Sequence, residues 1–548
     1  MNKRWIGVLL AVIAGTLSML HPALATAHGK APIVDVQWLG QNLARGDVLV
    51  LDVMPAPLHA KGHIPGAVNI DVFSFGGRSL SPAEMEKLIQ SWGISADRHV
   101  VIYDQGGTYF ATSLFFDLYY HGFPADRLVV LDGGFAKWQA SGGAVTKDPT
   151  PPPKPGTFRV EKVREEVRVR LPEFLVASGD PRNNALVEAL EPSQHFGGDK
   201  FFDRAGHIPN AIMAPGADFF NADKTFKSPE ELRRMLAYLG VKPEQQVYTH
   251  CGGGIAASVP FFAAKFMLDY PSVKLYKESQ LEWLRDDRGL PFWTYDAPNM
   301  TREKTWLSGW NGQMLRAFGV SKVSVVDVRP AEAFRQSHLP FAVNVPAEHF
   351  RNNLASPAKL AEVLGAAGVD MTHEAVIVSD KGLNPDSALA YLMLEKIGQK
   401  RVSVLSESVD DWAFAGLPVD KAADEADPKK MAARRMFIAP RAYPAALRPG
   451  IVVRDAGAAG LYPKVYIASG KSLPARMPEG KVIHLPYTDL VNADGSPKAA
   501  KDLWSILVKA GVPRYAELVS VSDDAGEAAA NYFILKLMGY PDVKVLAM

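Results

Sequence analysis

The sequence predicts an α/β protein in which one unit, built on a mostly parallel sheet, is repeated four times. With 548 residues the chain is too long for a single core, so three to five domains are expected. Short runs of Val, Ile and Leu alternate with segments of helical period, which is typical of parallel α/β folds. Two signatures then recur along the chain, and such a repeat fixes the number of domains.

The first signature is an apolar, strand-like run that leads into a turn of the Gly-His-Ile-Pro type. Three clear copies and one worn copy occupy residues 48–71, 185–215, 323–346 and 475–486. The turn histidines of the clear copies are His63, His207 and His338. One histidine per unit is not a ligand cluster, so we expect each to hydrogen-bond nearby backbone rather than to hold a metal.

The second signature is a β-rich run that ends at a polar residue, then a loop, mostly rich in glycine, and an amphipathic helix. Its four copies occupy residues 100–122, 246–267, 375–398 and 518–539. In the first three copies, further strand-like residues follow the helix and end at a tryptophan, which we expect to be a packing residue. These tryptophans are Trp138, Trp283 and Trp412.

The stretches between the copies predict the linkers. Residues 149–155 are rich in proline and should form a stiff, extended spacer. Residues 421–430 are charged and lack periodicity, which indicates a second linker. Residues 298–312 form a less distinct boundary.

Together, the Gly-His-Ile-Pro turn, the strand–Cys–loop–helix unit and the Gly-Gly-x₃-Trp ending resemble the rhodanese family. The resemblance covers nearly the whole mature chain and is weakest in the last copy. It implies that each copy is a small domain with a central five-stranded parallel sheet flanked by helices. It also implies a catalytic cysteine at the start of the loop after a central strand. The domains expected on this basis span residues 33–145, 170–298, 312–420 and, as a degenerate copy, 432–548.

In this alignment only one of the four domains carries a nucleophile. The four catalytic positions are Asp104, Cys251, Asp380 and Asp523. A carboxylate cannot form a persulfide, so three of the four domains are predicted to be inactive. The arrangement resembles the two-domain sulfurtransferases of the family, whose first domain is inactive. We therefore expect one active site per chain, in domain 2.

The chemistry is expected at Cys251, the single cysteine of the chain, which excludes intrachain disulfides and cysteine-based metal sites. The predicted substrate-binding loop that follows consists of Gly252, Gly253, Gly254, Ile255 and Ala256. Glycines let backbone N–H groups turn inward, and with the N-terminus of the next helix they should favour a thiolate and a persulfide.

The mechanism expected from this loop is a double displacement that needs no cofactor and no metal. The thiolate takes a sulfane sulfur from a donor such as thiosulfate, and the persulfide passes it to cyanide or a thiol. Alternatives are a buried structural cysteine, a phosphatase and a papain-like protease. A phosphatase needs an arginine where Ala256 and Ala257 stand. A protease needs a paired histidine, and His250 should point to the opposite face of the strand.

The identity of the donor is not settled by the loop. Thiosulfate-preferring members of the family carry basic residues after the cysteine, whereas the Cys-Gly start resembles mercaptopyruvate sulfurtransferases. The latter hold the substrate carboxylate with arginines, and Leu190 and Gln194 stand at those positions. Candidate substitutes are Arg204, Lys200, His195 or a residue of another domain.

Thiosulfate sulfurtransferase is the first interpretation and 3-mercaptopyruvate sulfurtransferase the second. The rival classes are a non-catalytic sulfur carrier or scaffold loaded by a protein partner, and a purely structural interaction protein.

The N-terminus and the net charge bear on location and partners. Residues 1–27 combine Lys3 and Arg4, an apolar run and an Ala-x-Ala site, as in a signal peptide, and the run is shorter than a membrane span. We therefore expect the protein to be periplasmic.

A formal net charge of +1 provides no overall attraction to nucleic acid or anionic membrane. The expected partners are a small-molecule sulfur donor and acceptor, with a protein thiol as a further possibility.

Overall fold

The computed structural model describes residues 31–74, 80–200, 202–454, 457 and 460–546, so the predicted signal peptide lies outside the described residues. The described chain forms four five-stranded sheets with the same strand order, in which the first strand is at one edge and the third at the other. All strand pairings given for these sheets are parallel, for example β2–β4 and β7–β9. The predicted fold class, four tandem α/β domains with five-stranded parallel sheets, is confirmed.

Domains 1 and 2 contain equivalent elements in equivalent order. The strands of domain 1 are β1 (Ile33–Val34), β2 (Val48–Asp52), β3 (Val68–Asn69), β4 (His99–Tyr103) and β5 (Leu128–Leu131), and its helices are α1 (Val36–Asn42), α2 (Ala56–His59), α3 (Pro82–Ser91), α4 (Phe110–Tyr120) and α5 (Gly134–Ala140). The strands of domain 2 are β6 (Arg168–Val169), β7 (Asn184–Glu188), β8 (Ala211–Met213), β9 (Gln246–His250) and β10 (Val273–Tyr276), and its helices are α6 (Leu171–Ser178), α7 (Pro192–His195), α8 (Pro229–Tyr238), α9 (Ser258–Phe262) and α10 (Ser279–Trp283).

Domains 3 and 4 repeat the sheet. The strands of domain 3 are β11 (Thr301–Arg302), β12 (Val323–Asp327), β13 (Ala342–Asn344), β14 (Glu374–Val378) and β15 (Arg401–Leu405), and its helices are α11 (Lys304–Trp310), α12 (Gln313–Ala317), α13 (Ala331–Gln336), α14 (Ala347–Asn352), α15 (Pro357–Ala367), α16 (Pro385–Lys396) and α17 (Val409–Phe414). After the connecting helix α18 (Pro428–Phe437), domain 4 contains β16 (Val452–Val453), β17 (Lys464–Ala468), β18 (Lys481–His484), β19 (Glu517–Val521), β20 (Val543–Leu546), α19 (Ala500–Lys509) and α20 (Ala525–Leu537).

Local sequence explains where these elements begin and why they pack. The inner strands β2, β12 and β19 are buried along their whole length, as expected for strands covered on both faces. Helices α3 and α8 begin with a Ser-Pro pair in which Ser81 and Ser228 form capping boxes with Glu84 and Glu231. Among the described residues, no helix is both long and apolar enough to span a bilayer.

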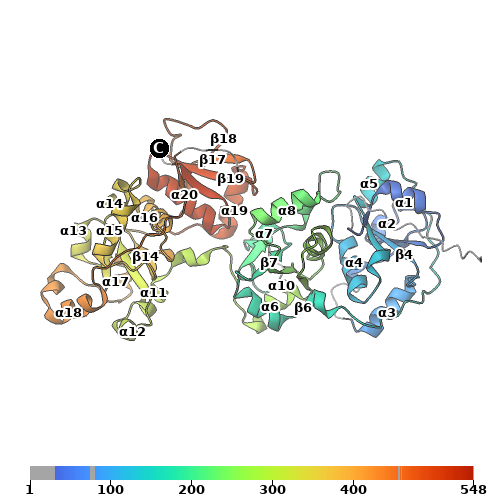
Figure 1. Cartoon of the computed structure of the whole chain (residues 1–548), viewed down its shortest axis with the longest axis horizontal. Coiled ribbons are helices and arrows are strands. Elements are labelled where there is room, and N and C mark those ends of the chain that lie inside the picture. The colour runs from blue at the N-terminus through green and yellow to red at the C-terminus, as the bar shows by residue number, and fades with distance from the viewer. Residues whose placement is uncertain (1–30, 75–79, 201, 455–456, 458–459, 547–548) are drawn as a thin grey trace, which may run out of the picture.

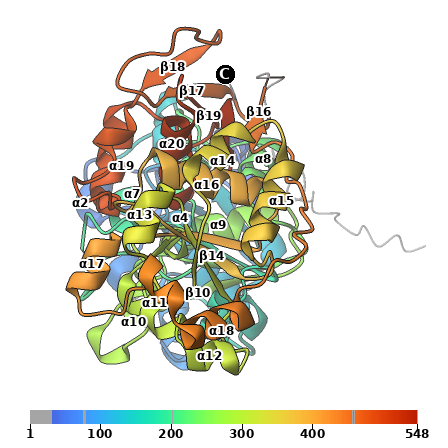
Figure 2. The same ribbon diagram turned by 90° about the vertical axis from the view of Figure 1, so that its left-hand side faces the viewer.

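The four domains associate as two pairs, each with a shared core. Helix α4 of domain 1 packs against α9 of domain 2, where Phe115 meets Phe262 edge-on at 4.9 Å between ring centroids. Helix α16 of domain 3 packs in the same way against α20 of domain 4, with Tyr391 and Phe533 at 4.8 Å. Figures 1 and 2 both show α16 beside α20.

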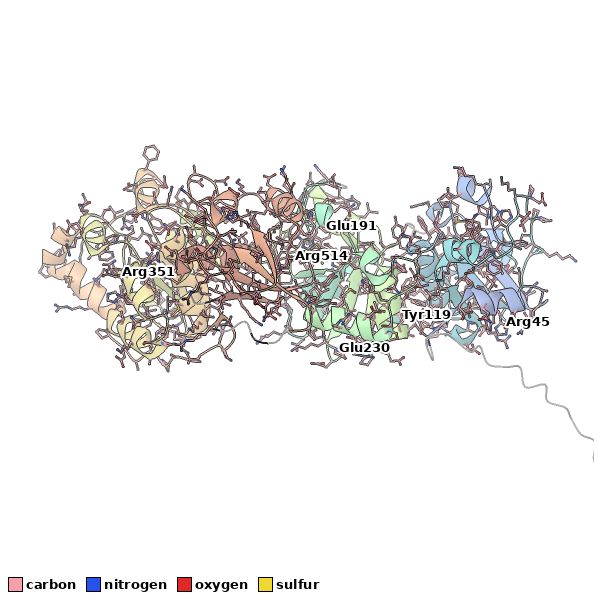
Figure 3. All side chains as sticks on the ribbon, turned by 90° about the horizontal axis from the view of Figure 1, so that it is seen from above. Arg45, Tyr119, Glu191, Glu230, Arg351 and Arg514 are labelled. Carbon is pink, nitrogen blue, oxygen red and sulfur yellow. The ribbon has the colours of Figure 1, made fainter. Side chains whose placement is uncertain are left out.

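The second pair folds back on the first, so that domain 4 lies between domains 2 and 3 (Figure 1). The Tyr238 hydroxyl of domain 2 donates to the Ala516 carbonyl of domain 4 at 2.8 Å. Arg514 of domain 4 pairs with Asp218 of domain 2 at 3.0 Å, and Figure 3 shows Arg514 at this junction. The catalytic candidate, domain 2, therefore contacts both domain 1 and domain 4.

Three boundaries differ from the sequence-based prediction. Domain 2 begins at residue 168 rather than 170, because the two-residue strand β6 pairs Arg168 with Leu275 at the sheet edge. Domain 3 begins at residue 301 rather than 312, because the two-residue strand β11 pairs Thr301 with Val404 at the sheet edge. A strand of two residues has no apolar run by which it could be recognised in the sequence. The predicted linker 421–430 contains the start of helix α18, whose first turn is capped by the Asp427 carboxylate, which accepts from the Lys429 amide.

Candidate active site

The strand register shows which residues are equivalent to Cys251. In every domain, the strand before the loop ends at a residue whose carbonyl accepts a hydrogen bond from the backbone that follows the neighbouring strand. These last strand residues are Tyr103, His250, Val378 and Val521. The next residues are therefore equivalent, and they are Cys251, Asp104, Ser379 and Ser522. The predicted positions Asp380 and Asp523 are each one residue too late. A serine hydroxyl, like a carboxylate, provides no thiol for a persulfide.

Cys251 lies at the carboxyl end of the central strand β9 and is only 3% exposed. The amide N–H of Gly254 donates to the Cys251 Sγ at 3.2 Å. Gly254 has a φ of +78°, and a Cβ there would lie 2.0 Å from the Lys277 carbonyl oxygen. A glycine is therefore required at this position, and it turns one backbone donor toward the sulfur.

The base of the loop is held by the segment that follows β10. The Cys251 amide donates to the Ser279 Oγ at 3.1 Å, and the Gln280 amide donates to the Cys251 carbonyl at 3.1 Å. Ser279 is buried and has a φ of +52°, an uncommon value for a residue with a side chain. In domain 1 the same place is taken by Gly134, with a φ of +53°. The sequence alone did not predict these contacts, because domain 2 has Glu278 and Ser279 where domain 1 has Gly133 and Gly134.

The helix after the loop differs from the expectation. Helix α9 begins only at Ser258 and is five residues long, and residues Ala263–Met267 continue it as a π-helix. The loop therefore consists of turns, and the Gly254 N–H rather than the start of a helix lies at the sulfur.

Domain 1 contributes to the surroundings of the site. The Ser258 hydroxyl lies 2.8 Å from the Thr112 hydroxyl and 3.4 Å from the Tyr109 carbonyl, both in domain 1. Burial and the nearby Cys251 raise the pKa of Tyr109. The sequence pattern of a single domain contains no signal for Tyr109, because it reaches the site from the neighbouring domain.

The proposed substitutes for the missing arginines have other partners. The Arg204 guanidinium donates to the carbonyls of Trp283, at 2.7 Å, and Arg285, at 3.2 Å, and it stacks on Phe292. Lys200 is exposed. His195 is fully buried between two carboxylates. Arg204 and His195 therefore have structural roles in domain 2.

The residues at the predicted arginine positions are also accounted for. Leu190 is buried, and a Cβ at Gly252 would lie 3.7 Å from it. Gln194 accepts from the Glu191 amide at 3.3 Å and caps α7.

His250 lies on the opposite face of β9 from the site, as predicted. Its ring packs edge-on against Phe174 at 5.4 Å, and its Nδ1 is 3.8 Å from the Glu188 carboxylate. Burial lowers the pKa of His250 to about 4. Because its ring lies on the face of β9 away from the site, His250 is not placed to act as the base for Cys251, which excludes a papain-like pair of these two residues.

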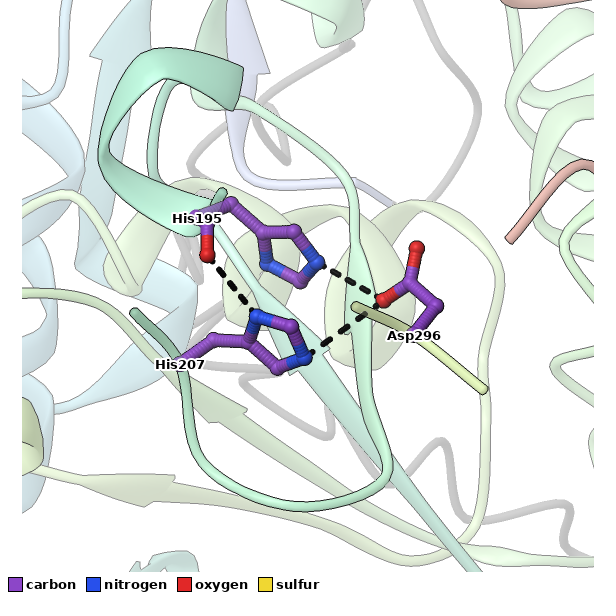
Figure 4. A group of neighbouring side chains, drawn as sticks. All are labelled: His195, His207 and Asp296. Atoms are coloured by element: carbon purple, nitrogen blue, oxygen red, sulfur yellow. Dashed lines mark hydrogen bonds and ion pairs between the residues drawn. The ribbon is translucent and has the colours of Figure 1, made fainter. Parts of the chain in front are cut away.

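His195 and His207, which are buried, and the partly exposed Asp296 form a cluster whose ligand atoms lie within 4.8 Å of one another (Figure 4). The two imidazole rings are stacked, 3.7 Å apart between centroids and only 2° from parallel. A metal ion binds in the plane of an imidazole, and two parallel planes this far apart cannot share one ion. The same stack recurs as His59 on His63, and as a phenylalanine on a histidine in domain 3. The geometry indicates packing rather than a metal centre.

The predicted hydrogen bonds of the turn histidines to nearby backbone are confirmed. The Nδ1 atoms of His63, His207 and His338 bond the carbonyls of His59, His195 and Phe334 at 3.0, 2.8 and 2.8 Å. The predicted packing tryptophans are likewise buried, and each indole N–H donates to a backbone carbonyl.

Comparison with known proteins gives consistent matches. The family model described as the rhodanese-like domain matches residues 35–141 and 311–415, which are domains 1 and 3. The chain is 32% identical over 277 residues to the sulfur carrier protein TtuD of Thermus thermophilus, covering 47% of this chain and 94% of that protein. It is 30% identical over 293 residues to a probable 3-mercaptopyruvate sulfurtransferase of Pseudomonas aeruginosa, covering 47% of this chain and 97% of that protein.

Among solved structures, the 3-mercaptopyruvate sulfurtransferase SseA of Escherichia coli aligns with a TM-score of 0.42 and 24% identity, covering 45% of this chain and 98% of that chain. The relatives of at least 30% identity are matched over nearly their whole length. The chain therefore belongs to the rhodanese family of sulfurtransferases.

Proposed function

We propose that the chain is an exported sulfurtransferase that moves a sulfane sulfur from thiosulfate or a related donor, through a persulfide on Cys251, to cyanide or a thiol. The observation that carries this proposal is the Gly254 N–H directed at the Cys251 sulfur from 3.2 Å, at the end of the central strand of domain 2. The full-length relatives named as sulfurtransferases support the same chemistry.

The reaction proceeds in two displacements at sulfur. The Cys251 thiolate attacks the outer sulfur of thiosulfate, the S–S bond of the donor breaks, and sulfite leaves with the electron pair. The acceptor then attacks the outer sulfur of the persulfide, the new S–S bond breaks, and the Cys251 thiolate is restored. The Gly254 N–H is a fixed donor at the Cys251 sulfur, which carries the negative charge before the first displacement and again after the second.

Thiosulfate is the sulfur donor that we propose first, and 3-mercaptopyruvate is the second candidate. The Pseudomonas relative is named for 3-mercaptopyruvate, and a putative thiosulfate sulfurtransferase of Synechococcus elongatus is 28% identical to the chain, which covers 90% of that protein. Arg204 and His195 have structural partners, so neither supplies a free cation to hold a substrate carboxylate. A donor that depends on a bidentate carboxylate clamp is therefore less well supported by the described residues.

A sulfur carrier is the second candidate function, because one 32%-identical relative is named as such. In that case Cys251 holds a persulfide that is loaded and unloaded by protein partners. A sulfurtransferase turns over with a small-molecule donor and acceptor alone, whereas a carrier requires its protein partners.

The test is the formation of thiocyanate from cyanide with either donor, using the wild type and Cys251→Ser. Turnover by the wild type and none by the variant supports a sulfurtransferase. A folded wild type that binds sulfur but does not turn over supports the carrier instead.

Export to the periplasm is also proposed, from residues 1–27. The mass of the protein recovered from the periplasmic fraction tests it: a chain that starts after residue 27 is expected, and a full-length chain in the cytoplasm contradicts it.

A further inference from the structure

A continuous set of side-chain contacts connects the backbone of Cys251 to the far side of domain 2. The Gln280 amide donates to the Cys251 carbonyl at 3.1 Å, and the Gln280 side chain donates to Glu188 at 2.6 Å. Glu188 bonds the Nδ1 of His195, whose Nε2 lies 2.7 Å from the Asp296 carboxylate. Figure 4 shows the outer end of this series, His195 and Asp296.

Domain 4 holds the outer end of the series. Asp296 lies against Gly539, just after α20: a Cβ at Gly539 would be 1.9 Å from the Asp296 Oδ2 and 2.9 Å from its Cβ. The neighbouring Ala297 amide donates to the Leu537 carbonyl at 3.2 Å, and the Tyr295 hydroxyl donates to the Lys498 carbonyl at 2.8 Å. The position of Asp296 therefore depends on how domain 4 docks.

The inner members of the series are buried, and Glu188 and His195 are also charged, which makes their positions interdependent. Glu188, His195 and Gln280 are each at most 3% exposed. Although burial lowers the pKa of His195, the two carboxylates raise it to about 9, so the ring is a cation at neutral pH. Displacing Asp296 leaves the buried His195 cation with Glu188 as its one carboxylate partner in this series, and the remaining groups must move to compensate for the lost counter-charge.

In domain 1, the contacts given for the equivalent residues stay within that domain. Asp52 bonds His59 at 2.6 Å and the Tyr103 hydroxyl at 2.8 Å. Phe135 takes the place of Gln280 and donates only its amide, to the Asp104 carbonyl. Among the described residues of domain 1, the stacked histidines therefore connect through Asp52 to Tyr103 at the end of β4, and not to the segment after β5, where Phe135 replaces Gln280.

We propose that domain 4 positions the Cys251 loop through Asp296, His195, Glu188 and Gln280, which act as positioning residues for the sulfur transfer. This proposal rests on the proposed function, and it assigns a role to the second pair of domains. It predicts that a change in domain 4 alters the reactivity of a cysteine in domain 2.

Gly539→Ala, in the full chain, is the direct test, because the added methyl group displaces Asp296. Gly511→Ala is the matched control: Gly511 also has a positive φ, +76°, and also follows a helix of domain 4, but a Cβ there would meet nothing within 4 Å. Two rates are measured, the gain of sulfur from thiosulfate and the alkylation of Cys251 by iodoacetamide. We expect Gly539→Ala to slow sulfur gain about tenfold or more and to change the alkylation rate, with Gly511→Ala near the wild type. Equal effects of the two variants overturn the proposal.

A double-mutant cycle tests whether the effect passes through Gln280. Gln280→Met keeps the backbone bond to Cys251 but removes the bond to Glu188. If the series transmits the effect, Gly539→Ala causes little further change in a Gln280→Met background, whereas additive effects contradict it. Should Gly539→Ala fail to fold, Asp296→Asn replaces it in the same cycle. A wild type that takes up no sulfur refutes the proposed function, and the alkylation rates still decide the coupling.

Discussion

The amide N–H of Gly254 points at the sulfur of Cys251 from 3.2 Å, at a backbone position that only glycine fits. Within the four repeats, this cysteine is found in domain 2, and Asp104, Ser379 and Ser522 occupy the equivalent positions. The chain therefore combines one domain that carries a cysteine at this position with three domains that do not.

The loop glycines are expected to differ sharply in their tolerance of a side chain. Gly254→Ala places a Cβ 2.0 Å from the Lys277 carbonyl, whereas Gly253→Ala meets nothing within 4 Å. Gly254→Ala should lower the rate of sulfur uptake by about a hundredfold, because the N–H donor is displaced from the sulfur. Gly253→Ala should stay within about threefold of the wild type. Similar rates for both variants would show that the Gly254 geometry is unimportant.

The ion pair between domains 1 and 2 is expected to be important for stability. Lys277 lies 2.9 Å from Asp117 of α4, and their side chains are 8% and 9% exposed. Lys277→Met leaves a buried carboxylate without its partner and should cost about 3–5 kcal/mol in urea unfolding. Arg285→Met removes an ion pair whose side chains are 52% and 60% exposed and should cost about 0.5 kcal/mol or less. Equal costs would contradict this difference.

The sequence was sufficient for the parts of the fold that are determined locally. The apolar runs and the turns at His63, His207 and His338 predicted the four domains, because strand, turn and helix are each encoded in adjacent residues. The loop start was misplaced by one residue in domains 3 and 4. Ser379 and Ser522 follow apolar runs and look like strand residues, and only the pairing with the neighbouring strand shows where the strand ends.

The surroundings of Cys251 could not be predicted in the same way. Tyr109, Ser279 and Gln280 come from other segments, and their role depends on how those segments dock. The Asp296–Gly539 contact joins the end of domain 2 to domain 4. A pattern within one repeat contains no information about contacts between repeats.

The buried histidines predict a stability maximum near pH 6.5. Burial and the nearby His195 cation lower the pKa of His207 to about 4, and burial lowers that of His250 to about 4. Below pH 6.5 these two histidines become protonated in the unfolded chain but stay neutral in the folded chain. The free energy of unfolding therefore falls as the pH is lowered toward 4. The pKa of His195 is raised to about 9, so its contribution is complete below pH 6.5 and is lost as the pH rises through 9.

The measurement is the thermal unfolding midpoint between pH 4 and pH 9.5. His250→Phe keeps an aromatic ring against Phe174 and should weaken the fall on the acid side. A midpoint that rises steadily up to pH 9.5 would contradict the role of His195.

Deletion of residues 312–548 is expected to reduce sulfur transfer without abolishing it. Domains 1 and 2 keep their shared core around α4 and α9, while Asp296 loses its contact with Gly539. The rate of thiocyanate formation, compared with circular dichroism of the same sample, checks this. Complete loss of activity in a folded truncation would contradict the view that the first two domains form the catalytic unit.

The most direct test is intact-protein mass spectrometry of the purified chain after treatment with thiosulfate and, separately, with 3-mercaptopyruvate. We predict that the wild type gains the mass of one sulfur atom with at least one donor, and that Cys251→Ser gains none. An unchanged wild-type mass with both donors, from folded protein with a free thiol, or an equal gain on Cys251→Ser, would contradict a Cys251 persulfide formed from these donors.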